Sequence, residues 1–294
     1  QNYNILSIKI RQSFSTQFAR IGHWCFSRKQ TARRAGCMLT PYNKVSNHMT
    51  DILPSDKRLK FFVYVIESPS AVDLYHRRSE GDMLSQVINL NQIACTVRLA
   101  VNLEAFTAAI RIGLHEAMEA FPNTIPILHI SAHGFSDGIQ LSSGEVILWR
   151  QLRELLIPVN QALSGSLIVC MSTCEGYSGS QMAMVPESND QPFWAIIGNC
   201  AKPTWPETAV AFATLYHLIA NGRYILDSVK AMCIASGNDS FFVTTAEESK
   251  QVYIEHIKNI NAAEVIEDLE HQTEETEPGE LAKLLRLSDT SNAN

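Results

Sequence analysis

Short apolar segments of strand type alternate with longer segments of helical periodicity from Leu59 onward, and this alternation restricts the fold more than any other feature. Strands are expected at Lys60–Ile66, Ile93–Val101, Ile125–Ser131, Leu167–Ser172, Phe193–Gly198 and Phe241–Thr244. Helices are expected at Asp73–Leu90, Asn102–Ala120, Leu148–Leu163, Pro206–Ala220, Ile225–Ala235 and Glu247–Ile260, with a small hairpin over Ile139–Leu148. Apolar strands separated by helices are typical of a parallel sheet covered on both faces. The sequence therefore predicts a three-layer α/β/α sandwich with about six strands.

The two ends of the chain differ from this middle part. Residues 1–58 show no regular period, and the first sixty residues carry 11 Lys and Arg against 2 acidic residues. We interpret 1–58 as a basic leader, disordered or wrongly assigned to the chain. Residues 262–294 carry 9 acidic residues against 2 basic ones and contain Pro278-Gly279, so we expect a mostly disordered acidic tail. The folded domain is then expected over 59–261.

Composition excludes several classes of protein. Hydrophobic residues make up 46% of the chain and charged residues 18%, which argues against a wholly disordered protein. No run of about 18 apolar residues is present, so we expect no membrane-spanning helix. The acidic balance of the middle region disfavours nucleic acid as a partner. Seven scattered cysteines without CxxC spacing indicate neither a disulfide framework nor a zinc site, so a cytoplasmic, reducing location is expected.

Two reactive residues follow predicted strands directly. His133 follows the strand that ends at Ser131, and Cys174 follows the strand that ends at Ser172. Because ligands and catalytic groups gather beyond the carboxyl ends of parallel strands, these two side chains would meet if the strands are neighbours. A thiol needs a base to attack as a thiolate, and an imidazole is its usual partner. The opposing interpretation is that Cys174 is a core cysteine, which is the commoner role of that residue.

The motifs around these residues resemble those of caspase-like (clan CD) cysteine peptidases of the CHAT-domain type. The strand-His-Gly motif of that family is similar to Leu128–Gly134, and its strand-Cys motif is similar to Leu167–Gly176. The spacing of 41 positions from His133 to Cys174 also fits the family. Its closing elements resemble Ile196–Gly198, Trp205–Ala209, Phe212, Tyr216, Leu218, Asn221-Gly222 and Ser228. The resemblance covers about 61–245 and implies a caspase-like sheet whose last strand is antiparallel.

The same resemblance implies roles for individual residues. Cys174 would be the nucleophile and His133 the general acid/base, while the backbone N–H groups of Gly134 and Cys174 would bind the oxyanion. Ser172, Trp205 and Glu207 would contact the substrate. The chain departs from the family at Ser172-Thr173, where many relatives have a small residue such as Ala before the Cys, and in the early position of Glu207. Both departures concern substrate preference.

Several other residues have simpler interpretations. His129 and Cys170 lie within predicted strands, so we expect a buried histidine and a core cysteine. Glu207 or Thr208 could serve only to cap the helix after Pro206. His115-Glu116 begins a zinc-protease pattern, but Glu119 stands where the second His is needed, and no glycine-rich nucleotide motif is present. We therefore predict neither a metal nor a cofactor.

Three functions compete at this point. The first is a cysteine endopeptidase that cleaves a protein or peptide substrate and is activated by a separate regulatory or sensor protein. The second is a catalytically silent caspase-like module that only binds a partner, and the third is a flavodoxin-like small-ligand module. The loop Met184–Gln191 is long and polar, and two interpretations are open. It is either an ordinary surface connection or a mobile segment near the cleft that a partner would order.

Overall fold

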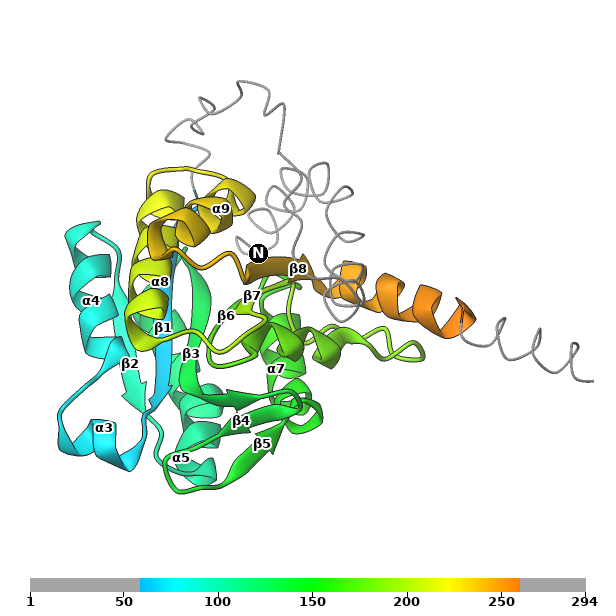
Figure 1. The fold of residues 1–294 in the computed structure, drawn as a ribbon, viewed down its shortest axis with the longest axis horizontal. Helices are drawn as coiled ribbons and strands as arrows, with labels where there is room; N and C mark the ends of the chain where they lie inside the picture. The colour runs from blue at the N-terminus through cyan, green and yellow to red at the C-terminus, as the bar shows by residue number, and fades with distance from the viewer. Residues whose placement is uncertain (1–58, 260–294) are drawn as a thin grey trace, which may run out of the picture. The chain divides into compact units, whose positions relative to one another are not determined.

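The computed structural model describes residues 59–259, and its centre is a sheet of strand order β2-β1-β3-β6-β7-β8 (Figure 1). β1, β2, β3, β6 and β7 are parallel, and β8 pairs with β7 in the antiparallel direction. The predicted mostly parallel sheet of six strands with an antiparallel last strand is thus confirmed. The six strands are β1 (Phe61–Ser68), β2 (Cys95–Leu99), β3 (Ile125–Phe135), β6 (Ile168–Ser172), β7 (Ala195–Asn199) and β8 (Phe241–Thr245).

A short hairpin extends this sheet from the end of β3. It consists of β4 (Gly138–Gln140), which pairs antiparallel with the last residues of β3, and β5 (Val146–Leu148). β3 is therefore four residues longer than predicted, because its end continues beyond Ser131 to pair with β4. His133 lies in this extension.

Helices cover both faces of the sheet and complete the predicted three layers (Figure 1). The helical segments are α3 (Ala71–Tyr75), α4 (Glu80–Leu90), α5 (Leu103–Ala108), the π-helical turn η2 (Ala109–Gly113), α6 (Leu114–Ala120), α7 (Trp149–Ala162), the 3-10 segment η3 (Gly176–Ala183), α8 (Trp205–Ala220) and α9 (Ile225–Ser236). Residues 246–259 are also helical, close to the expected 247–260.

Alternation along the strands divides the interior into two cores. Phe62, Tyr64 and Ile66 of β1 pack with α5, α6 and α7 on one face. Phe61 and Val65 of the same strand pack toward α4, α8 and α9 on the other. Because successive side chains of a strand point to opposite faces, a strand covered on both sides must be apolar at every position. This explains the continuous apolar runs of the sequence.

Two predicted helices are interrupted in the structure. The helix expected over Asp73–Leu90 is split into α3 and α4, because Arg77 adopts a left-handed conformation (φ 51°) and Ser79 caps a new helix. The helix expected to end at Ala120 contains η2, where the Tyr64 hydroxyl donates to the Ala109 carbonyl at 2.8 Å. A side chain inserted into a helical ladder widens one turn, so Tyr64 accounts for the π-helical turn.

The loop 184–191 lies elsewhere than predicted. Asn160 joins it to the start of β6, because its side chain donates to the Gln191 carbonyl and accepts from the Leu167 N–H. The buried Arg153 side chain donates to the carbonyl of Asp190 and to the hydroxyl of Ser188, both at 2.8 Å. The loop is therefore anchored at the amino ends of β6 and β7, opposite the edge that carries Cys174. The interpretation that it borders the cleft is wrong, because these hydrogen bonds hold it to α7 at the opposite edge.

The predicted leader 1–58 and the whole predicted tail 262–294 lie outside the described residues, so both stay predictions.

Candidate active site

His133 and Cys174 lie beyond neighbouring strands at equivalent positions. β3 and β6 are parallel and adjacent, and the last residues in register are Ser131 and Ser172. His133 stands two residues after Ser131, and Cys174 stands two residues after Ser172. The condition set by the sequence analysis, that the two strands be neighbours, is therefore met. Both residues lie at the same carboxyl edge of the sheet, where α/β proteins place their reactive groups.

Backbone packing brings the two segments together above the sheet. A Cβ atom built on Gly134 would lie 2.0 Å from the Cys174 carbonyl oxygen and 2.8 Å from the side chain of Thr173. Real Cβ atoms do not approach so closely, so only glycine allows the main chain after His133 to contact the main chain of Cys174. Gly134 therefore has a steric requirement at this position, in addition to the oxyanion role that the resemblance implies.

A tight turn carries Cys174 out of β6. The Gly176 N–H donates to the Thr173 carbonyl at 3.2 Å, and Glu175 adopts a left-handed conformation with φ 52°. Such a conformation costs a non-glycine residue of order 1 kcal/mol and is common at functional sites. The Glu175 N–H donates to the Ala201 carbonyl at 2.7 Å, which holds the turn against the segment after β7. Cys174 is thereby fixed at the rim of the sheet.

The two candidate catalytic side chains are both accessible. His133 is exposed and Cys174 is partly buried. Within the described part of the chain, no hydrogen bond joins the imidazole of His133 to the thiol of Cys174. Hydrogen bonds between a nucleophile and its base are often long or absent without substrate and tighten when substrate binds. The arrangement places an imidazole and a thiol at the same edge of the sheet, without a hydrogen bond between them.

The electrostatic environment of Cys174 favours the thiol over the thiolate. Burial raises the pKa of Cys174 above its ordinary value, and the negative charge of Glu175 acts in the same direction. The Lys202 ammonium and the backbone N–H of Cys174 itself lower that pKa, but they do not offset the burial. Nucleophilic attack by Cys174 would thus require a base that removes the proton.

The three residues predicted to contact the substrate have different surroundings. Ser172 is buried at the end of β6, where its hydroxyl donates to the Glu80 carboxylate at 2.6 Å. Trp205 begins α8 and is 40% exposed, so part of its indole is open to a ligand. Glu207 forms a capping box, because its carboxylate accepts the backbone N–H of Thr204, which lowers the pKa of Glu207. The helix-capping interpretation of Glu207 is confirmed.

The interior positions on the same two strands also agree with the sequence analysis. His129 and Cys170 are register partners and are fully buried, as expected for core residues. The His129 ring stands edge-on to Phe212 at 4.8 Å between centroids, and its Nδ1 lies 2.8 Å from the Tyr216 hydroxyl. The predicted assignment of His129 and Cys170 to the core is therefore confirmed.

Sequence reasoning missed three residues near the site. Glu80 reaches the ends of β3 and β6 from the first turn of α4, and Lys202 and Glu175 set the electrostatic environment of Cys174. Glu175 is next to Cys174 and could have been noticed from the sequence. Glu80 and Lys202 carry no motif, and Glu80 is 51 and 92 positions away from its two serine partners, so no local pattern pointed to them.

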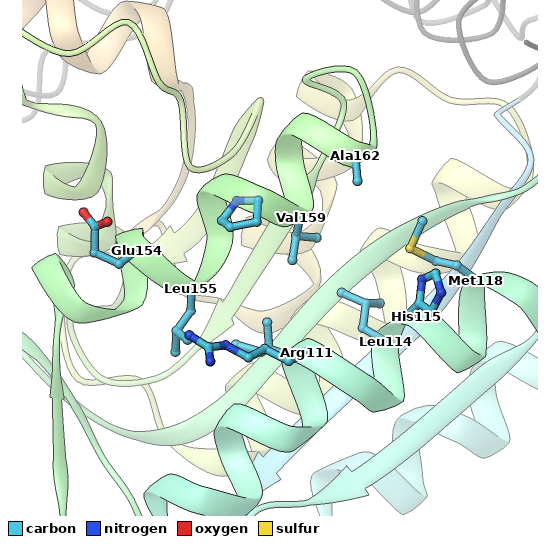
Figure 2. A pocket seen from close by; sticks show the side chains of 10 residues that line it. Arg111, Leu114, His115, Met118, Glu154, Leu155, Val159 and Ala162 are labelled. Atoms are coloured by element: carbon cyan, nitrogen blue, oxygen red, sulfur yellow. The ribbon is translucent and has the colours of Figure 1, made fainter.

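An apolar groove on the side of the sheet that α6 and α7 cover contains none of the predicted site residues. It lies between the η2–α6 segment and α7, and Figure 2 shows its lining side chains, which include Arg111, Leu114, Met118, Leu155 and Val159. Within residues 59–259 no cluster of three or more His, Cys, Asp and Glu side chains is arranged to hold a metal ion. No helix in the same range is both long and apolar enough to cross a membrane.

Comparisons with known proteins find matches among solved structures but not among family models or curated proteins. No protein-family model matches the chain, and no curated protein matches it in sequence. Among solved structures, the chain is similar to a secreted C11 cysteine protease from Bacteroides thetaiotaomicron in complex with an irreversible peptide inhibitor, with 9% identity and a TM-score of 0.41 over 65% of this chain and 67% of that one. It is also similar to a second structure of a secreted C11 cysteine protease from that organism, called iotapain, with 11% identity and a TM-score of 0.41 over 65% and 68%. This is a distant structural resemblance to caspase-like cysteine proteases.

Proposed function

We propose that the chain is a cysteine endopeptidase that cleaves a partner protein, with Cys174 as the nucleophile and His133 as the general acid/base. One observation carries the proposal. The register of β3 and β6 places an accessible imidazole and an accessible thiol at equivalent positions on neighbouring strand ends, and Gly134 packs directly on the Cys174 carbonyl. This placement of the two side chains supports acyl transfer by the pair.

The chemistry follows from the protonation state of the thiol. Because the pKa of Cys174 is raised, the proton must leave as attack begins, and His133 would accept it. The sulfur forms a bond to the scissile carbonyl carbon, and the C–N bond then breaks as His133 returns the proton to the leaving amine. Water next attacks the thioester and gives a proton to His133. The C–S bond then breaks, and His133 returns that proton to the departing sulfur, which releases the acid and restores the free thiol.

The backbone N–H groups of Gly134 and Cys174 are proposed as the oxyanion hole. The backbone N–H of Cys174 lies near its own sulfur and lowers the pKa of the thiol. A donor in that position is close to the carbonyl that the sulfur attacks. Gly134 lies against the same residue, which supports the pairing of its N–H with that of Cys174. Fixed donors at a developing oxyanion contribute about 3–4 kcal/mol of transition-state stabilisation each.

Substrate contacts belong to the same proposal. Of the three predicted residues, Trp205 has open surface, whereas Ser172 is buried and Glu207 already caps α8. We therefore expect Trp205 to contribute most to binding. Ser172 and Glu207 would contribute less, because their side chains are already bonded to Glu80 and to the Thr204 N–H.

We also propose that a separate sensor protein activates the peptidase. The loop 184–191 is not its mechanism, because it lies at the opposite edge of the sheet. The isolated chain is expected to have low basal activity that rises when the partner binds, and full activity of the isolated chain would contradict this point.

A catalytically silent binding module is the second candidate. The raised pKa of Cys174 and the missing hydrogen bond to His133 within the described residues favour it, because both describe an unreactive thiol. A silent module would need the same fold but no working pair.

The deciding experiment combines a peptide library with a covalent probe. Fluorogenic peptides varied at the residue before the scissile bond are assayed with the wild-type chain, Cys174→Ala and Cys170→Ala. A peptidyl acyloxymethyl ketone is then used to label the same proteins. A peptidase loses cleavage and labelling only with Cys174→Ala. Equal, slow labelling of Cys174 and Cys170 without any cleavage would support the silent module.

A further inference from the structure

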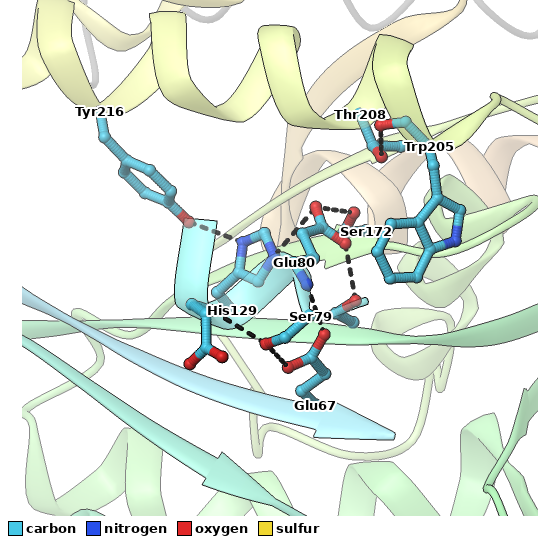
Figure 3. A network of polar contacts seen from close by, with 10 residues as sticks. Glu67, Ser79, Glu80, His129, Ser172, Trp205, Thr208 and Tyr216 are labelled. Carbon is cyan, nitrogen blue, oxygen red and sulfur yellow. Dashed lines mark hydrogen bonds and ion pairs between the residues drawn. The ribbon is translucent and has the colours of Figure 1, made fainter. Parts of the chain in front are cut away.

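A buried carboxylate joins the ends of the two strands that carry the candidate pair (Figure 3). Glu80 is 4% exposed, and its two oxygens accept from two different strands. The Ser131 hydroxyl of β3 donates to Oε2 at 2.6 Å, and the Ser172 hydroxyl of β6 donates to Oε1 at 2.6 Å. Hydrogen bonds of this length to a charged acceptor are among the stronger ones in proteins. Glu80 therefore forms a bridge across the β3–β6 interface.

The bridge lies at the last position where the two strands are in register. Ser131 and Ser172 are the final pair of the β3–β6 ladder, and His133 and Cys174 follow two residues later. Two residues of a strand span about 6.6 Å. After this pair β3 continues into the hairpin with β4, while β6 turns through Glu175. The separation of the two segments beyond the ladder is therefore set next to the serines that Glu80 holds.

Glu80 is itself firmly placed. Its backbone N–H donates to Oε1 of Glu67 at 2.6 Å, and the hydroxyl of Ser79 donates to Oε2 of Glu67 at 2.6 Å. Glu67 is the register partner of Ser131 on β1, so one row of residues crosses β1, β3 and β6 beneath the first turn of α4. The bridge is thus anchored to three strands and to a helix start.

One buried nitrogen atom in this network has no hydrogen-bond partner. Nε2 of His129 has no hydrogen-bond partner and lies 3.7 Å from Oε1 of Glu80, which is too long for a hydrogen bond. The two serines are therefore the side chains that hydrogen-bond the Glu80 carboxylate, rather than His129. Burial of a carboxylate is costly without such bonds, so both serine contacts are needed to keep it there.

We infer that Glu80 is a positioning residue for the candidate pair. By holding Ser131 and Ser172 together it fixes the ends of β3 and β6, and through them it sets His133 against Cys174. Glu80 contacts neither His133 nor Cys174, and it takes no part in proton transfer. The inference rests on the proposed function, because it assigns a structural cause to the pairing of His133 and Cys174.

The test measures how strongly His133 influences Cys174, with and without the bridge. Iodoacetamide alkylates Cys174 at a rate that mass spectrometry of the Cys174 peptide reports, and no substrate is needed. The rate ratio between wild type and His133→Ala gives the influence of His133. The same ratio is measured in Glu80→Gln and Glu80→Ala backgrounds, which completes a double-mutant cycle. Thermal unfolding of each protein is recorded alongside.

Positioning predicts a graded loss of this ratio. It should fall by about twofold or more in Glu80→Ala, the lower limit for residues coupled in one network, and by less in Glu80→Gln. Gln keeps the length of the side chain and one acceptor oxygen, so it should rescue part of the ratio. Ser131→Ala and Ser172→Ala each remove one arm of the bridge and should give intermediate ratios. These two variants replace Glu80→Ala if that protein fails to fold.

Glu248→Gln is the matched control. Glu248 also begins a helix after a strand, and its carboxylate accepts the Thr245 N–H at 3.0 Å, but it lies beside β8 at the edge of the sheet. Its replacement should leave the ratio unchanged even if the melting temperature falls. An unchanged ratio in all Glu80 and serine variants, with only lower melting temperatures, would overturn the inference alone. A ratio of one in the wild type would overturn the proposed pair itself.

Discussion

The strands β3 and β6 carry the same two residue types twice, and the two pairs have opposite surroundings. His129 and Cys170 are register partners in the middle of the sheet, and both are fully buried. His133 and Cys174 stand four residues further along the chain, at the open edge, with His133 exposed and Cys174 partly buried beyond the end of β6. The interior pair and the edge pair therefore differ in position and not in chemistry.

The difference shows how the fold decides which thiol is available for reaction. Burial raises the pKa of Cys170 to about 12, and the Tyr216 hydroxyl is its hydrogen-bond partner. The pKa of Cys174 is also raised by burial, but Lys202 acts against the shift. A side chain beyond a strand end retains access to solvent and to loop charges, whereas one within the strand does not. The distance of four residues separates a core cysteine from a candidate nucleophile.

The largest effect is expected when each of the two cysteines is replaced by alanine in turn. Cys174→Ala should lower peptide cleavage by at least about 10³-fold, because a nucleophile has no substitute. Its melting temperature should stay close to that of the wild type, since Cys174 is at the rim. Cys170→Ala should retain activity and lose about 1 kcal/mol of unfolding free energy, because it leaves a space in the core. Cleavage rates and thermal unfolding of both variants check the comparison, which a nearly fully active Cys174→Ala would refute.

The two histidines give the second effect. His133→Ala should lower the cleavage rate by about 10²–10⁴-fold, the usual contribution of a general acid/base, without a change in melting temperature. His129→Ala should instead lower the unfolding free energy by about 2–4 kcal/mol, because it removes a ring packed against Phe212 and a hydrogen bond to Tyr216. Denaturant unfolding and cleavage assays on both variants separate the roles. A stable but inactive His129→Ala would contradict the assignment of His129 to the core.

The strands and the core residues could be predicted from the sequence, whereas the distortions of two helices could not. The six strands followed from apolar runs such as Phe61–Ile66, because a strand covered on both faces must be apolar throughout. The core assignment of His129 and Cys170 followed from their place inside such runs. The break in the helix at Arg77 and the widened turn at Ala109 could not be predicted. The first depends on the left-handed conformation of Arg77, and the second depends on Tyr64 of β1.

The surroundings of the site were the least predictable part. The bridge of Glu80 joins residues far apart in sequence, and the influence of Lys202 comes from the segment after β7. The loop 184–191 was placed at the wrong edge because its polarity gave no information about the buried Arg153 that holds it. The local sequence pattern predicts the helices, the strands and the strand ends. The charged residues and hydrogen bonds around the strand ends come from segments that are distant in sequence.

The pH dependence of alkylation should sharpen the comparison between the two thiols. Cys174 should react with iodoacetamide at a midpoint pH above that of an ordinary thiol, because burial raises its pKa, and below that of Cys170. Lys202→Met should move the Cys174 midpoint further up, since the ammonium lowers the pKa, and Glu175→Gln should move it down. Shifts of about half a pH unit are expected for charges near the surface. Rates of peptide alkylation across pH check both signs, and a midpoint insensitive to Lys202 would contradict this account.

The smallest effect concerns Glu67, which lies between the interior pair and the edge pair along the sheet. Burial raises the pKa of Glu67 above its ordinary value of 4.5, so the folded state holds the proton more tightly than the unfolded state does. This contribution to stability is fully present below the unfolded pKa, and it is lost as pH rises through the folded pKa. The unfolding free energy of the wild type relative to Glu67→Gln should therefore fall as pH rises above about 4.5, by at most about 1.4 kcal/mol per pH unit for one group.

Glu145 provides a control of opposite sign for this measurement. Its carboxylate accepts the Leu103 N–H at 3.0 Å and the Ser143 hydroxyl at 2.8 Å, and these bonds lower the pKa of Glu145. A lowered pKa contributes stability above the unfolded pKa that is lost as pH falls, so the wild type should gain relative to Glu145→Gln as pH rises. Urea unfolding of the three proteins between about pH 4 and 7 compares the slopes. Slopes of the same sign for Glu67 and Glu145 would show that desolvation does not dominate at Glu67, and that the buried row beneath the edge pair is more open to water than its contacts indicate.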